Sequence, residues 1–118
     1  MKLAIGTAQF GLDYGISNAG GRTSQAEAER ILSYANAAGI DTLDTAAAYG
    51  DSEKVLGHIG VPGWKVISKV PPLPGADVNG KDWVLDHVRR SLGRLGIKQL
   101  DGLLLHHAPD LLSDQGRN

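Results

Sequence analysis

Residues 44–57 read DTAAAYGDSEKVLG and join a β-prone run to a short helix through a single turn. The β-prone run covers residues 40–46 and is interrupted by carboxylates. The turn opens at Tyr49, and residues 52–59 then place apolar side chains at helical intervals. Because Gly60 follows directly, we expect the helix to end there. The stretch therefore predicts a strand, a polar loop and a helix in that order.

The same alternation of strand and helix extends in both directions from this stretch. Further strands are expected at residues 2–7, 64–70 and 100–105, and further helices at residues 24–38 and 81–95. The Gly-rich, polar sequence after the first strand is expected to form a long loop. The run 100–105 is nearly all apolar, as expected of a strand that is buried on both faces. The order βαβαβαβ predicts parallel strands with right-handed crossovers.

Composition narrows the classes of function. Lys and Arg number 12 and Asp and Glu number 13, which gives a net charge of -1. With no run of like charges, nucleic acid and anionic membranes are poor first expectations. The absence of cysteine excludes disulfides and cysteine zinc sites, and the apolar residues near the start are too few for a targeting or membrane segment. We therefore expect a single cytoplasmic domain over residues 1–118.

Two architectures fit parallel strands with helical connections: an open doubly wound sheet and a (β/α)8 barrel, of which this chain would supply about four strands and three helices. The pattern alone does not choose between them. In both, the loops after the strand ends form the functional face, and these positions hold Asp44, Tyr49, Lys69 and His106. An ammonium beside a phenol favours the phenolate, so these groups form a credible set for proton transfer.

Residues 44–57 match D-T-A-x-x-Y-G-x-S-E-x-x-L-G, and by this signature the chain resembles the aldo-keto reductases over nearly its whole length. The supporting segments are IGTAQFG at 5–11, ISK at 67–69, SLGRL at 91–95 and DGLLLH at 101–106. The resemblance implies the α/β class and the parallel (β/α)8 TIM barrel. It also implies that residues 1–118 form the N-terminal half of that barrel, with the C-terminal half absent.

The resemblance further implies an oxidoreductase that reduces an aldehyde, a ketone or a sugar-like carbonyl compound. The implied hydride donor is NADPH, with NADH as the alternative. Tyr49 would be the general acid, Lys69 would tune it, Asp44 would pair with Lys69, and His106 would orient the carbonyl. The positions that match the nicotinamide end of the cofactor site are Gly6, Thr7 and Asp44. The family's other cofactor contacts lie in the absent half, so the resemblance does not by itself imply cofactor binding by these residues alone.

The histidine after the fourth strand has two candidates. The family reads H-x-P there, whereas this sequence reads His106-His107-Ala108-Pro109. Counting forward from Asp101 selects His106, and counting back from Pro109 selects His107. We prefer His106, because the pleat of the strand fixes the forward count while the loop can absorb an extra residue at little cost.

Other readings of the same residues lead to other functions. A half-barrel would have two unpaired strand edges and an apolar interior without its opposite wall, which predicts self-association. The chain could thus be a catalytically inactive fragment or an assembly module. A metal-dependent lyase or isomerase would rest on His106, His107 and Asp110, and this is a thin signal for a metal site. The three arginines of the last helix, Arg89, Arg90 and Arg94, are read as a solvated face rather than a phosphate site.

Overall fold

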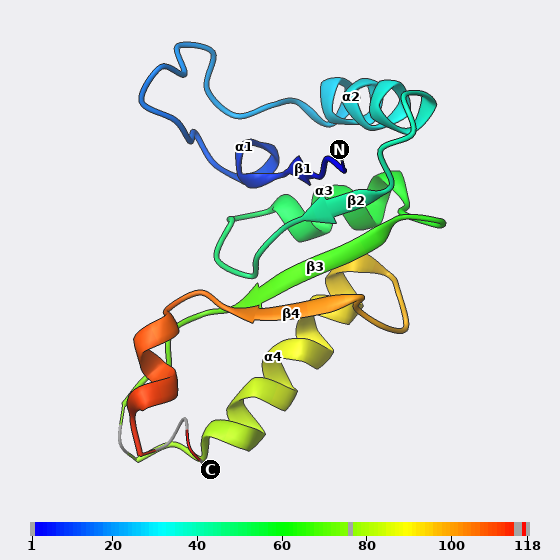
Figure 1. Cartoon of the computed structure of the whole chain (residues 1–118). Coiled ribbons are helices and arrows are strands. Elements are labelled where there is room, and N and C mark those ends of the chain that lie inside the picture. The colour runs from blue at the N-terminus through cyan, green and yellow to red at the C-terminus, as the bar shows by residue number, and fades with distance from the viewer. Residues whose placement is uncertain (1, 76, 115–116, 118) are drawn as a thin grey trace.

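The computed structural model describes residues 2–75, 77–114 and 117, and its centre is a parallel four-stranded sheet in the order β1-β2-β3-β4 (Figure 1). The strands are β1 (Ile5–Gly6), β2 (Thr42–Asp44), β3 (Lys65–Val70) and β4 (Gly102–Leu105). The helices are α1 (Ala8–Gly11), α2 (Gln25–Ala37), α3 (Ser52–Ile59), α4 (Gly80–Leu95) and the 3-10 helix η1 (Ala108–Leu112). In the described part of the chain, no helix is long and apolar enough to cross a bilayer.

Local capping signals set the ends of the longer helices. The side chain of Ser24 accepts a hydrogen bond from the backbone N–H of Glu27 at 3.2 Å, and this caps α2. Asn79 caps α4 in the same way, by accepting from the N–H of Asp82 at 3.2 Å. Gly96 ends α4 in the left-handed region, with a φ of 67°. These predicted helices are therefore confirmed to within a residue or two at their starts.

The core is a single apolar layer between the sheet and the helices. Its buried members are Phe10, Ala28, Leu32, Leu43, Leu56, Val61, Val66 and Leu95. Side chains alternate across β3, where Val66, Ser68 and Val70 are buried and the residues between them are partly exposed. The buried set faces the helices, because Ser68 bonds a side chain of α3. The opposite face of the sheet is not covered by the described helices (Figure 1).

The loop predicted after β1 is wrong in its first residues, because Ala8–Gly11 form the short helix α1. Four residues are too few to show a helical period in the sequence. Tertiary packing holds the turn instead. Phe10 enters the core, and the Cβ that an alanine would add at Gly11 would lie 1.8 Å from the backbone oxygen of Tyr49. Contact with the turn at Tyr49 thus defines α1.

The prediction that residues 100–105 are buried on both faces is also wrong. Leu103 is 42% exposed and Leu104 is 48% exposed. β4 is the last strand in the sheet order, and among the described residues it pairs with β3 alone. An apolar run reports how hydrophobic a strand is but not how many neighbours it has. The two leucines point to opposite faces of the sheet, and both faces are open at this edge.

Two glycines inside helices should respond in opposite ways to substitution by alanine. A Cβ at Gly57 would lie 2.0 Å from the backbone oxygen of Arg94, so α3 and α4 touch there, whereas a Cβ at Gly93 would meet no atom within 4 Å. We expect Gly57→Ala to lower the free energy of unfolding by about 1–3 kcal/mol or more. Gly93→Ala should raise it by about 0.5–1 kcal/mol. Urea unfolding of both variants checks this, and equal effects would contradict the contact.

Candidate active site

Four polar side chains gather at the C-terminal ends of the strands. Asp44 ends β2, Lys69 is the penultimate residue of β3, and His106 directly follows β4. Tyr49 lies in the loop between β2 and α3. The ends of parallel strands share one edge of the sheet, which in such folds forms the functional face. The structure therefore brings together all four residues that were predicted for catalysis.

Lys69 lies at the centre of this cluster. Its Nζ donates a hydrogen bond to Oδ1 of Asp44 and another to the carbonyl of Thr45 at 3.0 Å. The same atom lies 5.0 Å from the centroid of the Tyr49 ring. The side chain of Lys69 is 15% exposed and that of Asp44 is 40% exposed. The ammonium is thus largely withdrawn from water, and the Asp44 carboxylate balances its charge.

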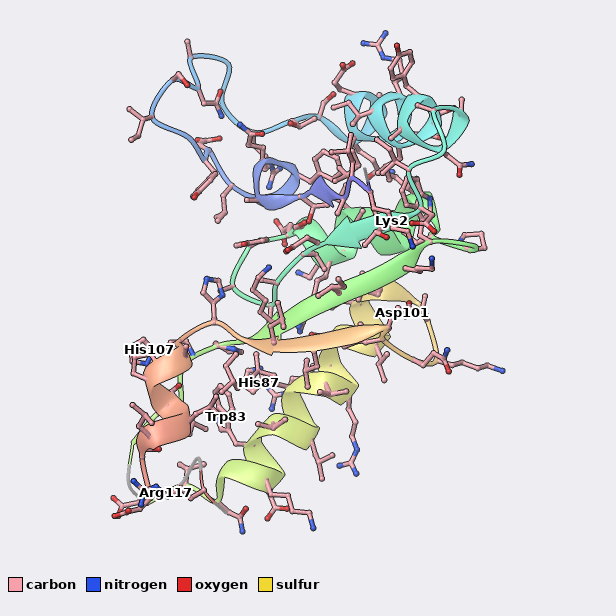
Figure 2. The ribbon with its side chains drawn as sticks, viewed as in Figure 1. Lys2, Trp83, His87, Asp101, His107 and Arg117 are labelled. Atoms are coloured by element: carbon pink, nitrogen blue, oxygen red, sulfur yellow. The ribbon has the colours of Figure 1, made fainter. Side chains whose placement is uncertain are left out.

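His106 lies on another side of Tyr49. The two ring centroids are 5.7 Å apart with an interplanar angle of 86°, which is an edge-to-face contact. The register with β3 fixes this position, since the N–H of His106 donates to the carbonyl of Val70 at 3.0 Å. Figure 2 shows Asp101 at the other end of β4, and its carboxylate accepts the N–H of Val66 at 2.9 Å. Counting forward from Asp101 therefore selects the histidine that lies beside the phenol.

His107 has a different partner. Figure 2 shows it at the start of η1, and its Nδ1 lies 2.8 Å from Oδ1 of Asp110. Oδ2 of Asp110 accepts the N–H of Leu73 at 2.9 Å. The hydrogen bond from His107 and then that from Leu73 hold the pKa of Asp110 below its usual value. Asp110 thus attaches η1 to the loop after β3. Within the described ranges, no three acidic or histidine side chains gather as metal ligands would.

The residues predicted to line the cofactor differ in accessibility. Gly6 ends β1 in register with Asp44, and a Cβ at Gly6 would meet no atom within 4 Å. The sheet is therefore open at Gly6, next to Asp44 on β2, and no side chain at this position would block a bound ring. Thr7 is fully buried, and its hydroxyl donates to the carbonyl of Asp44 at 3.0 Å. Its contact is with Asp44 rather than with open space.

A buried ion pair behind the site was missed by reasoning from the sequence. Glu53 accepts hydrogen bonds from the hydroxyl of Ser68 at 2.6 Å and from Nε of Arg94 at 2.8 Å. The pair ties together α3, β3 and α4. A signal was present, because Glu53 lies three residues before Leu56 and so on the buried stripe of α3.

The solvated arginine face of α4 therefore needs one correction. Arg94 is 28% exposed and bonds Glu53, which is 2% exposed. Arg89 is exposed, and Arg90 forms an exposed pair with Asp86. Arg94 lies three residues after Ser91, which is buried, and so it borders the buried side of α4. The charge of an arginine does not by itself indicate whether its side chain is exposed.

Similarity to known proteins extends over nearly the whole chain. The model of the aldo/keto reductase family matches residues 2–114. A crystal structure from Pseudomonas aeruginosa, assigned to the aldo-keto reductases, is 31% identical with a TM-score of 0.77, and the match covers 94% of this chain and 46% of that one. A second such structure from the same organism has 31% identity and a TM-score of 0.75, over 94% and 44% of the two chains.

An aldo-keto reductase of Bacillus halodurans in its holo form is 23% identical with a TM-score of 0.66, over 88% of this chain and 35% of that one, which shows the fold alone. No curated protein matches the sequence significantly. The chain thus spans less than half the length of these solved proteins. Together the matches confirm the predicted α/β class and the (β/α)8 barrel, of which the described residues form four strands.

Proposed function

Because this chain belongs to the aldo/keto reductase family, we propose that it carries the proton-transfer residues of a reductase for aldehydes and ketones that uses NADPH or NADH. The observation that carries this proposal is the placement of Lys69 against both Asp44 and the Tyr49 ring. The proposed substrates are small carbonyl compounds, sugar-like ones among them. The cofactor, when bound, supplies the hydride that adds to the carbonyl carbon.

Each residue of the cluster then has a role that follows from its contacts. Tyr49 donates its phenolic proton to the carbonyl oxygen as negative charge develops there. The Lys69 ammonium, 5.0 Å from the ring centroid, stabilises the phenolate that remains. Asp44 holds this ammonium in place and offsets its charge. His106, edge-on to the phenol, is placed to donate a hydrogen bond that orients the carbonyl.

Gly6 and Asp44 are proposed to border the nicotinamide end of the cofactor. The open space at Gly6 and the carboxylate in register with it support this assignment. Thr7 is proposed to act on the same region through Asp44, whose carbonyl it bonds. Residues 1–118 are proposed to be the N-terminal half of the barrel, in keeping with the 46% share of the Pseudomonas aeruginosa chain that they match.

Titration of the purified chain with NADPH, followed by nicotinamide fluorescence, tests the proposal. A panel of short aldehydes and ketones is then added, and the loss of NADPH absorbance is measured. We expect a saturable fluorescence change and substrate-dependent turnover. If neither is observed, these residues do not form a working site on their own. The inactive half-barrel would then be the better description.

The exposed edge of β4 favours a second function, that of an assembly module. Because Leu103 and Leu104 are exposed on opposite faces of this edge strand, we propose that the chain self-associates through it. Light scattering at micromolar concentration should show a mass above that of one chain. Leu103→Lys should lower this mass, while the control Tyr34→Lys, at an exposed position of α2, should not. A monomeric unmodified chain would contradict the proposal.

A further inference from the structure

Three buried hydroxyl groups connect the backbone segments that carry the site. The Oγ1 of Thr45 lies 3.2 Å from the Oγ of Ser52. That Oγ donates to the carbonyl of Thr7 at 2.9 Å and lies 2.9 Å from the Oγ1 of Thr7. The Oγ1 of Thr7 in turn donates to the carbonyl of Asp44 at 3.0 Å. The chain of hydroxyls thus links the ends of β1 and β2 to the start of α3.

Each of the three residues also has a direct bond to one group of the site. Thr7 donates its N–H to the carbonyl of Asp44 at 3.0 Å, and Ser52 donates its N–H to the carbonyl of Tyr49 at 3.0 Å. The carbonyl of Thr45 accepts the Nζ of Lys69 at 3.0 Å. Asp44, Tyr49 and Lys69 are therefore each attached to a different member of the hydroxyl chain.

The hydroxyls themselves cannot reach a substrate. Thr7, Thr45 and Ser52 are all fully buried. Burying a hydroxyl is costly unless it is bonded, and an apolar residue of the same shape would fill the same space. An apolar residue makes no directional interaction. A hydrogen bond depends on the distance and angle between its two groups, so it defines the relative position of two segments more closely than packing alone.

The turn at Tyr49 is also closed from behind by α1. Gly50 has a φ of 55°, and a Cβ there would lie 2.4 Å from the backbone oxygen of Gly11. The backbones of the turn and of α1 are thus in contact. This backbone contact limits the turn on that side, and the hydroxyl chain ties the start of α3 to the ends of β1 and β2.

We propose that Thr7, Thr45 and Ser52 are positioning residues, which hold Asp44, Tyr49 and Lys69 at the separations needed for proton transfer. This inference rests on the proposed function for its catalytic meaning. Its structural content is independent of that function, since it states that removal of one buried hydroxyl displaces the phenol of Tyr49. The two can therefore be tested separately.

The test uses the full chain labelled with 3-fluorotyrosine and observed by fluorine NMR, without cofactor or substrate. The chain has three tyrosines, at positions 14, 34 and 49, and Tyr49→Phe assigns the third signal. Thr7→Val removes the hydroxyl and keeps the shape of the side chain, whereas Thr7→Ser keeps the hydroxyl. We expect Thr7→Val to shift or split the signal of Tyr49 alone. Thr7→Ser should leave that signal close to its original position.

Two further variants keep the test decisive. Thr45→Val removes a second hydroxyl of the chain, so the test survives if Thr7→Val does not fold. Leu32→Val weakens the core under α2 without removing a hydroxyl, and should not move the Tyr49 signal. The proposal is overturned if the signal stays in place in the folded hydroxyl-free variants. It is equally overturned if Leu32→Val moves the signal as much.

Kinetics provide a second readout in any preparation that turns over. A misplaced general acid slows the chemical step without weakening ground-state binding. We therefore expect Thr7→Val to lower kcat by about 10–100-fold, with little change in the KM for the carbonyl substrate. A change confined to KM would overturn the proposal. If the unmodified chain has no activity, the proposed function fails, and the NMR result still decides whether the hydroxyls position Tyr49.

Discussion

Replacing Tyr49 with phenylalanine is expected to lower the rate of carbonyl reduction by about 10²–10⁴-fold. Phenylalanine keeps the ring beside His106 and Lys69 but has no proton to donate. Because the ring contacts are kept, the free energy of unfolding and the affinity for NADPH should change little. Initial rates at saturating NADPH, measured in a preparation that turns over, give the comparison.

The other two tyrosines are matched controls for this substitution. Tyr14 and Tyr34 are exposed, and neither has a contact with the cluster around Lys69 among the described interactions. Tyr14→Phe and Tyr34→Phe should leave the rate nearly unchanged. If Tyr49→Phe retained more than about a tenth of the original rate, Tyr49 would not be the general acid. His106, which lies edge-to-face with the Tyr49 ring, would then be the next residue to replace.

Replacing Arg94 with methionine is expected to lower the free energy of unfolding by about 3–5 kcal/mol. The substitution leaves the Glu53 carboxylate, which is 2% exposed, with Ser68 as its remaining side-chain partner. A buried charge without its counter-ion is among the most destabilising changes that a single substitution can make. Urea unfolding followed by circular dichroism measures the loss. If the variant is already unfolded in buffer, the loss is larger still and the prediction also holds.

The same helix supplies the control for Arg94. Arg90→Met removes an exposed ion pair with Asp86 and should change the free energy of unfolding by less than about 0.5–1 kcal/mol. Replacing both partners of the buried pair, with Glu53→Leu and Arg94→Met together, should recover much of the loss. Similar losses for Arg90→Met and Arg94→Met would show that the buried pair does not stabilise the fold.

The helices were predictable from the sequence where their signals are local. The bounds of α3 match the predicted 52–59, because the glycine after Ile59 ends the apolar period at a defined residue. α4 was predicted almost as closely, since Gly96 ends it. α1 was not predictable in this way. Its four residues form a helix because they pack on the turn at Tyr49, a contact between segments that are far apart in the sequence.

The candidate site also has parts that the sequence predicts and parts that depend on contacts between distant segments. Asp44, Lys69 and His106 could be placed together from the sequence, because parallel topology puts the ends of all strands at one edge. Glu53 carried a local signal of burial, because it lies three residues before Leu56 on the buried stripe of α3. The sequence does not show which cation Glu53 pairs with. The environment of Glu53 depends on where α3 and α4 cross, and that crossing follows from the close approach at Gly57.

In β3, even-numbered residues pack in the core, whereas odd-numbered residues lie on the face of the proposed site. Val66, Ser68 and Val70 face the helices, and the residues between them face the side of the sheet that carries Lys69. Side chains of the proposed site could therefore be changed at odd positions of this strand while the even positions keep the chain folded. Deleting one residue of the strand before Lys69 would move Lys69 and the residue after it to the opposite faces. The ammonium would then be driven into the core, and both the proposed site and the packing of the core would be lost in one step.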